Sequence, residues 1–161
     1  MSQCKVSLYD LFGRQGNMAW CGDMQALYLD GTFKQAPPLL HQVYVILGER
    51  HGHVFPFFYA LLPNKRCLTY QQQFTTMAKK SLNLKPMSIS MDYEITALQE
   101  AQMTFPTAQI FGCLFHLTRN MKKKLTDEQL LGRYNVDANF VLQVIFLNVQ
   151  KINRFTIENF F

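Results

Sequence analysis

Three segments with strand-type patterns follow one another directly, and this order limits the folds open to the chain. They are MQALYLDGTFK (24–34), HQVYVILGE (41–49) and VFPFFYALLP (54–63). The links are short, and the link RHGH at 50–53 places Gly52 between two histidines, which is typical of a turn. Three strands with short links predict an antiparallel meander. Pro56 cannot donate a ladder hydrogen bond, so the third strand is expected at a sheet edge.

The apolar period changes after residue 67. Residues 68–84 repeat apolar side chains at three- and four-residue steps, which predicts an amphipathic helix with Thr69 as a candidate N-cap. The segments that follow are a strand at 86–92, a helix at 93–105 before Pro106, a strand at 108–113, a helix at 114–125, and further helices started by Thr126 and Asp137. This order predicts a mixed α/β sheet with helices on both faces.

Composition limits the class of protein. With 161 residues, 48% hydrophobic and 17% charged, the chain is expected to form a globular domain with a real core. Its apolar runs are shorter than the roughly 20 residues of a membrane span, and its start lacks a secretory signal. The four cysteines show no disulfide spacing, which favours an intracellular protein. The net charge of +5 is compatible with a polyanionic partner.

Two acids stand at corresponding places. Asp30 lies in the first strand, and Asp92 ends the strand at 86–92. Alone, each has an ordinary interpretation: Asp-Gly is a common turn pair, and Asp is a favoured helix N-cap. Reacting groups in open α/β sheets, however, gather at the carboxyl ends of strands. If these strands are neighbours, the two carboxylates can share a divalent metal such as Mg²⁺, which needs only one or two protein carboxylates.

The chain resembles the catalytic domain of Mutator-like element (MULE) transposases over residues 24–150. The matching pieces are LDGTFK (29–34), GHVFPFFYALLPNK (52–65), SISMDYEITALQEA (88–101), FPTAQIFGCLFHLTRNMKKKL (105–125) and, more loosely, DANFVLQVIFLN (137–148). The resemblance implies a ribonuclease H-like five-stranded sheet of order 3-2-1-4-5, followed by the start of a C-terminal helical insertion. It also implies that Asp30 and Asp92 are the first two members of an Asp-Asp-Glu triad that binds Mg²⁺ or Mn²⁺ for DNA transposition and recombination.

Cys113 and His116 form a Cys-x-x-His pair that the family also has after its second Asp. One interpretation is half of a zinc site, but a closed site needs four ligands and the only further pair is His51-x-His53. A second gives His116 a role at the scissile phosphate. A third is structural, with a buried Cys and a His at the sheet–helix junction.

Positive charge concentrates in the helix at 114–125. Arg119, Lys122, Lys123 and Lys124 are either a solvated helix end or contacts to DNA backbone phosphates, and the neighbouring motifs favour DNA. Lys34, just after the first strand, is a further candidate for the same substrate.

The third acid of the triad has no match in its expected context. The acids after the Cys-x-x-His pair are Asp127, Glu128, Asp137 and Glu158. We therefore expect an irregular lead-in at 1–22, a transposase core at 23–125, and an incomplete helical insertion at 126–161. The expected protein is a truncated or host-adopted transposase core in the nucleus, with DNA as partner and possible self-assembly. The alternative is a catalytically inactive, domesticated DNA-binding or protein-interaction domain.

Overall fold

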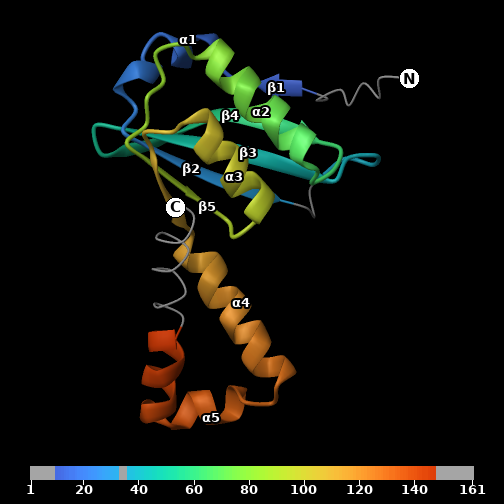
Figure 1. Ribbon diagram of the computed structural model, residues 1–161, viewed down its shortest axis with the longest axis vertical. Coiled ribbons are helices and arrows are strands. Elements are labelled where there is room, and N and C mark those ends of the chain that lie inside the picture. Colours follow the sequence, from blue (N-terminus) through green and yellow to red (C-terminus); the bar gives the residue numbers. More distant parts are fainter. Residues whose placement is uncertain (1–9, 33–35, 148–161) are drawn as a thin grey trace. The chain divides into compact units, whose positions relative to one another are not determined.

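A computed structural model describes residues 10–32 and 36–147 of the chain (Figure 1). The chain divides into two compact units, residues 1–111 and 112–161. The first unit holds the sheet and the helices packed on it. The second holds the helices after the last strand, and each unit is described by itself.

The first unit contains a six-stranded mixed sheet of order β1-β4-β3-β2-β5-β6. Its strands are β1 (Asp10–Phe12), β2 (Ala26–Thr32), β3 (Gln42–Arg50), β4 (His53–Leu62), β5 (Ser88–Met91) and β6 (Gln109–Gly112). Strands β4, β3 and β2 form the predicted antiparallel meander, and β2 pairs in parallel with β5. The predicted order 3-2-1-4-5 is therefore confirmed for β2 to β6.

The number of strands was predicted wrongly, because the lead-in contributes β1. Residues 10–12 pair antiparallel with 59–61 of β4, so that part of the lead-in is not irregular. A short helix α1 (Gln15–Met18) and the 3₁₀ turn η1 (Cys21–Asp23) follow it. A three-residue strand carries no visible period, and its hydrogen bonds come from a segment about fifty residues away. The pairing of β1 with β4 is therefore a long-range contact that the local sequence pattern does not predict.

The β3–β4 hairpin has the tight turn that its sequence predicts. His51 and Gly52 both have positive φ, at 51° and 75°, and Arg50 pairs with His53. This is the pattern of a two-residue turn whose twist matches that of the flanking strands. A bulge follows, because Ile46 pairs with Phe58 but Leu47 pairs with Pro56.

Pro56 lies at a point of β4 where the described part of the chain supplies only one neighbouring strand, β3. Strand β1 covers β4 only at residues 59–61, so β4 is not the outermost strand, contrary to prediction, although β1 does not reach Pro56. Bulges and unpaired edges are the places that tolerate proline, because no ladder hydrogen bond is sacrificed there.

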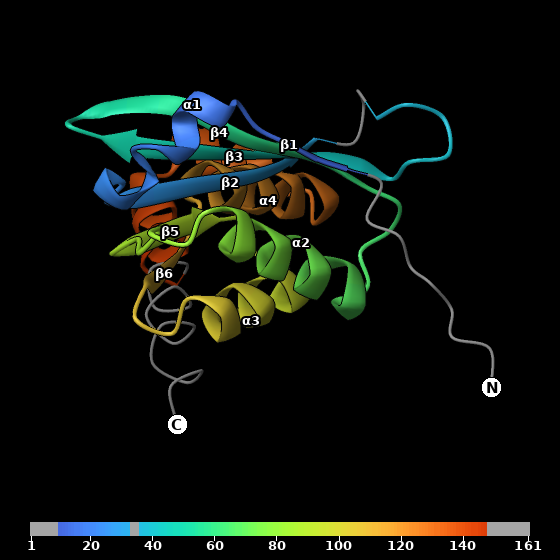
Figure 2. The same cartoon turned by 90° about the horizontal axis from the view of Figure 1, so that it is seen from above.

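Two helices cover one face of the sheet (Figure 2). They are α2 (Cys67–Lys80) and α3 (Ile95–Thr104). Tyr70, Phe74 and Met77 of α2 are fully buried at three- and four-residue steps, as the period predicted. The predicted cap is wrong: α2 begins at Cys67, and Thr69 lies buried within the first turn, where its hydroxyl bonds Asn64 Oδ1 at 2.7 Å.

The second unit is helical. It contains α4 (Leu114–Asp127), α5 (Leu131–Val136) and helical residues 138–147. Thr126 does not start a helix, because α4 continues through it and its hydroxyl bonds the carbonyl of Lys122 at 3.0 Å. Asp137 does, and its Oδ1 accepts the backbone N–H of Phe140 at 3.1 Å, the geometry of an N-cap. None of the helices in residues 10–32 and 36–147 has the length and apolarity needed to cross a membrane.

Candidate functional site

The parallel pairing of β2 with β5 brings the two predicted acids to neighbouring strands. Leu29 of β2 pairs with Met91 of β5. Asp30 follows Leu29 directly, and Asp92 follows Met91 directly. Adjacent strands lie about 4.8 Å apart, so the two acids leave neighbouring backbones at the same level of the sheet. Leu29 is buried beneath the helices. Because successive side chains of a strand point to opposite faces, Asp30 lies on the other, exposed face of the sheet.

Strand β3 places a tyrosine hydroxyl within the field of these acids. Tyr44 is buried on the helix side of the sheet, and its pKa lies well above the usual value. Burial is the main cause of the raised pKa, followed by Tyr70 and by the negative charges of Glu94, Asp92 and Asp30. The three carboxylates therefore act on one buried hydroxyl, and negative charge gathers at this end of the sheet.

A buried amide connects β3 to helix α2. Gln42 is 1% exposed, and its Nε2 donates to the Tyr70 hydroxyl at 2.8 Å. On its other side it presses against the strand that carries Asp30, because a Cβ on Gly31 would stand 2.6 Å from Gln42 Oε1. The Asp-Gly pair does not form a turn, because Gly31 lies within β2. At this position the Gln42 side chain leaves no room for a methyl group.

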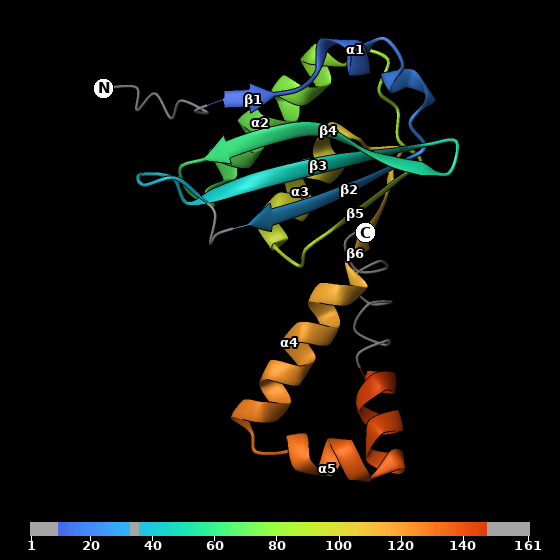
Figure 3. The same cartoon turned by 180° about the vertical axis from the view of Figure 1, so that it is seen from behind.

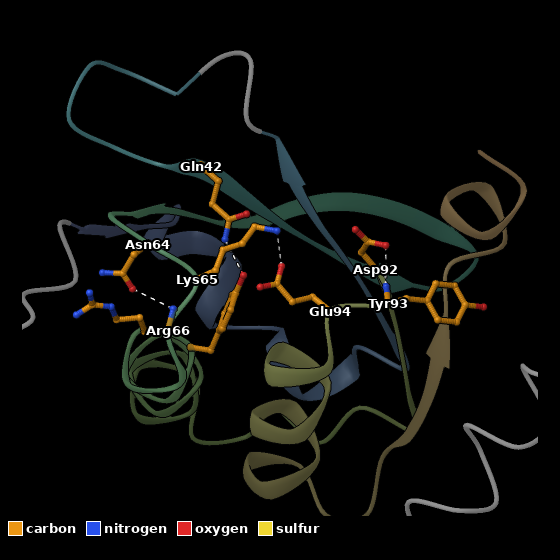
Figure 4. A network of polar contacts seen from close by, with 8 residues as sticks. Gln42, Asn64, Lys65, Arg66, Asp92, Tyr93 and Glu94 are labelled. Atoms are coloured by element: carbon orange, nitrogen blue, oxygen red, sulfur yellow. Dashed lines mark hydrogen bonds and ion pairs between the residues drawn. The ribbon is translucent and has the colours of Figure 1, made fainter. Parts of the chain in front are cut away.

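The network continues to a third carboxylate, Glu94, at the start of α3. Lys65 Nζ lies 2.7 Å from Glu94 Oε2, and Figure 4 shows these two side chains facing each other. In the same view Asp92 Oδ1 accepts the backbone N–H of Tyr93 at 2.7 Å. Burial, more than Glu94 or Asp92, keeps the pKa of Tyr70 above its usual value. Lys65 thus offsets one of the three negative charges.

Replacement of Gly31 by alanine is expected to destabilise the fold by about 1–3 kcal/mol, the usual range for overpacking a filled core. Gln42 cannot move aside freely, because it is buried and bonded to Tyr70. Denaturant unfolding measures the change in free energy. Gly16→Ala is the matched control, since nothing lies within 4 Å of its Cβ position. Equal stabilities of the two variants would show that the Gln42 contact imposes no constraint on Gly31.

Helix α4 separates the predicted cations into two groups. Arg119, Lys122 and Lys123 are exposed and stand three and four residues apart, so they share one face. Lys124 points elsewhere and forms an ion pair with Glu128 at 3.0 Å. We call Arg119, Lys122 and Lys123 the basic face of α4.

Cys113 and His116 lie at the start of the same helix. Cys113 is the N-cap residue of α4 and is a free, half-buried thiol. The His116 ring meets the Phe115 ring edge-on, with centroids 5.7 Å apart. Across residues 10–32 and 36–147, no group of three or more His, Cys, Asp or Glu residues forms a metal-binding cluster. The described residues therefore provide no further ligands for zinc at this pair.

Two predicted candidates lie outside the described residues, namely Lys34 and Glu158. Conversely, the contacts of Gln42, Tyr44, Tyr70, Glu94 and Lys65 were not anticipated from sequence. One signal was available: Glu94 follows Asp92 by two residues, so the two acids are visible together in the sequence. Nothing local marked the others, whose contacts span 26 or more residues.

Comparison with known families identifies one match. A model described as MULE transposase domain matches residues 26–120, which is more than half of the chain. The matched range contains both Asp30 and Asp92, the Cys-x-x-His pair, and Arg119 of the basic face. A search of curated protein sequences found no match.

Proposed function

The chain belongs to the MULE transposase domain family, and on that basis we propose that it binds a divalent cation through Asp30 and Asp92 and DNA through the basic face of α4. The observation that carries the metal proposal is the parallel β2–β5 pairing, which ends one residue before each acid. The DNA proposal rests on the transposase family and on three exposed cations sharing one helix face.

The donor set of Asp30 and Asp92 fits Mg²⁺ or Mn²⁺. Both side chains supply hard oxygen ligands, and Mg²⁺ is commonly held by one or two carboxylates with water and phosphate at the other positions. The described residues contain no group of three or more His, Cys, Asp or Glu residues that could hold a metal, and Mg²⁺ does not require one. When bound, the ion would supply charge stabilisation at a phosphodiester. Gly31, Gln42 and Tyr70 then serve to hold the strand that carries Asp30.

The basic face is suited to phosphates rather than to bases. Arg119, Lys122 and Lys123 are long, exposed side chains, and contacts of this kind position a protein on DNA without reading its sequence. Lys124 is less available because Glu128 pairs with it. We therefore propose weak, sequence-tolerant DNA binding. Cys113 and His116 lie at the start of this helix and are proposed to support the active site. Lys34 remains a further proposed contact to DNA.

The variant Lys122→Ala/Lys123→Ala is expected to bind duplex DNA more weakly and with a shallower salt dependence. Removal of one phosphate-binding cation reduces the slope of log K against log salt by about 0.9, so removal of both reduces it by about 1.8. Fluorescence anisotropy of a labelled duplex between low and moderate salt measures this slope. The control, Lys79→Ala/Lys85→Ala, removes the same charge from exposed lysines elsewhere. An unchanged slope in the α4 variant would remove this helix from the DNA site.

The proposed function is binding of a cation and of DNA, and it does not include cleavage of a DNA strand. A second metal ion across the scissile phosphate normally needs further anionic ligands, and the described residues contain no cluster of three. We therefore expect no metal-dependent nicking of supercoiled plasmid by this chain alone with Mg²⁺ or Mn²⁺. Nicking by the unmodified chain that disappears in both Asp30→Ala and Glu158→Gln would instead establish an active transposase with Glu158 as third acid.

The alternative function is a domesticated domain that binds DNA or protein without a metal. Retained DNA binding together with absent Mg²⁺ binding would favour it. The main proposal has DNA as partner, which leads us to propose a nuclear location and, by analogy with transposase assemblies, self-association on DNA.

A further inference from the structure

A hollow lined in part by aromatic residues lies on the β4 side of the sheet, where Figure 3 shows β1 and α1 beside that strand. Its volume is about 490 Å³, within the roughly 300–1,000 Å³ of sites that hold small molecules. The lining residues are Phe12, Gly13, Arg14, Asn17, Phe55, Pro56, Phe57 and Tyr59. We call it the β4 hollow. Strand β3 stands between it and the strand of Asp30, so it is separate from the proposed metal site.

The backbone of Pro56, in the wall of the β4 hollow, is not available for strand pairing. Pro56 has no N–H to donate, and its carbonyl oxygen accepts a hydrogen bond from Asn17 Nδ2 at 2.9 Å. Gly13 lets the chain pass close to Phe58, whose ring carbon would stand 2.6 Å from a Cβ at that position. An additional β-strand therefore cannot pair at Pro56. At Pro56, a ligand in the hollow is therefore held by side chains and not by main-chain hydrogen bonds.

The side chains around the hollow present aromatic surface and positive charge. Phe12, Phe55 and Tyr59 are 47%, 42% and 41% exposed, although large aromatic residues are usually more buried than this. Arg14 is an exposed cation in the same lining. Aromatic faces combined with a nearby cation are the means by which proteins hold unstacked bases of single-stranded nucleic acid next to a phosphate.

We propose that the β4 hollow binds unpaired bases of single-stranded DNA by stacking on Phe12 and Tyr59, which are directly paired across β1 and β4, with Arg14 at the adjacent phosphate. The proposal deepens the proposed DNA-binding function and rests on it for the nature of the partner. Duplex DNA cannot bind in this way, because its base faces are already stacked on each other and are not free to stack on aromatic side chains. A polyproline peptide also suits aromatic grooves, but the family and the net charge of +5 favour a nucleic acid.

The chain carries its own reporter of this hollow. Trp20 is its single tryptophan, and its ring meets that of Phe55 edge-on, with centroids 5.8 Å apart. The Arg50 guanidinium lies 5.2 Å above the same indole ring. Tryptophan emission therefore responds to a ligand that contacts Phe55. The full chain is titrated with oligothymidylate, with an abasic oligomer of equal length, with a blunt duplex, and with a polyproline peptide.

Oligothymidylate is expected to change the Trp20 emission and to bind more tightly than the abasic oligomer. Phe12→Leu/Tyr59→Leu keeps apolar side chains but removes the flat rings, and should weaken oligothymidylate binding roughly fivefold or more. Phe111→Leu is the matched control, since Phe111 is also aromatic and 40% exposed but lies on β6. Its affinity should equal that of the unmodified chain.

The outcomes separate this proposal from DNA binding by α4. Oligothymidylate binding without duplex binding would support the β4 hollow and contradict the basic face. Equal affinity for the abasic oligomer, or no effect of the double Leu variant, would overturn the β4 hollow even if Lys122→Ala/Lys123→Ala weakens duplex binding. A Trp20 response to polyproline but not to oligothymidylate would overturn it in favour of a peptide ligand.

Discussion

Asp30→Asn is expected to weaken Mg²⁺ binding by at least about tenfold, since replacing even an outer-shell partner of a metal ligand costs about 10–100-fold in affinity. The change removes one of two carboxylates that follow the Leu29–Met91 strand pair. The Asn amide keeps nearly the same size, so the weaker binding reports charge and ligation rather than packing. Asp92→Asn should have the same effect, and the double variant, which keeps neither carboxylate, should bind Mg²⁺ more weakly than either single variant. Isothermal titration calorimetry with MgCl₂, and with MnCl₂ as a second ion, measures all three.

Asp127→Asn is the control for this experiment. Asp127 is an exposed acid in α4, so its replacement changes the net charge equally without touching β2 or β5. Its metal affinity should match that of the unmodified chain. Full Mg²⁺ affinity in Asp30→Asn would contradict the metal site. Weaker binding in Asp127→Asn as well would show only a nonspecific effect of net charge.

Phe74→Ala is expected to lower the free energy of unfolding by about 3–5 kcal/mol, the range for removing a large aromatic from a packed core. Phe74 is fully buried on the face of α2 that packs in the core of the first unit, one turn after Tyr70. The cavity would loosen the helix that holds Tyr70, and through it Gln42 beside Gly31. Urea or guanidinium unfolding followed by circular dichroism measures the change.

Leu68→Ala removes an aliphatic side chain from the same helix and is the matched control. Leu68 is 54% exposed, so the effect of its replacement on the free energy of unfolding should stay within about 0.5 kcal/mol. If the two variants unfold at the same denaturant concentration, then α2 does not pack through the face that the structure assigns. If Mg²⁺ raises the free energy of unfolding more in Phe74→Ala than in the unmodified chain, then packing of α2 also affects the metal site at Asp30.

Much of the fold is visible in the local pattern. The alternation of residues in 42–50 and the three- and four-residue steps in 67–80 depend on the side-chain periods of single elements, which neighbours in sequence determine. The His51–Gly52 turn and the Asp137 cap are also local, since each uses groups within a few residues. The strand order, by contrast, came with the family resemblance and not from period.

Local signals failed at three places, and only the last of these depends on a distant contact. Thr126 is a good N-cap by type, yet α4 continues through it until Asp127. Thr69 is likewise a good cap, but it lies buried in α2 and bonds Asn64 instead. Strand β1 is too short to show a pattern, and it forms because β4 offers backbone groups for pairing at residues 59–61.

For the candidate site, the amino-acid pattern predicted which residues to consider: an acid within one strand, an acid at the end of another, and a cluster of cations in one helix. What surrounds these residues depends on tertiary contacts. Those contacts placed Asp30 and Asp92 on neighbouring parallel strands and filled the space beside Gly31 with Gln42. Strand pairing and burial join residues far apart in the chain, whereas periodicity records only which side of its own element a residue occupies.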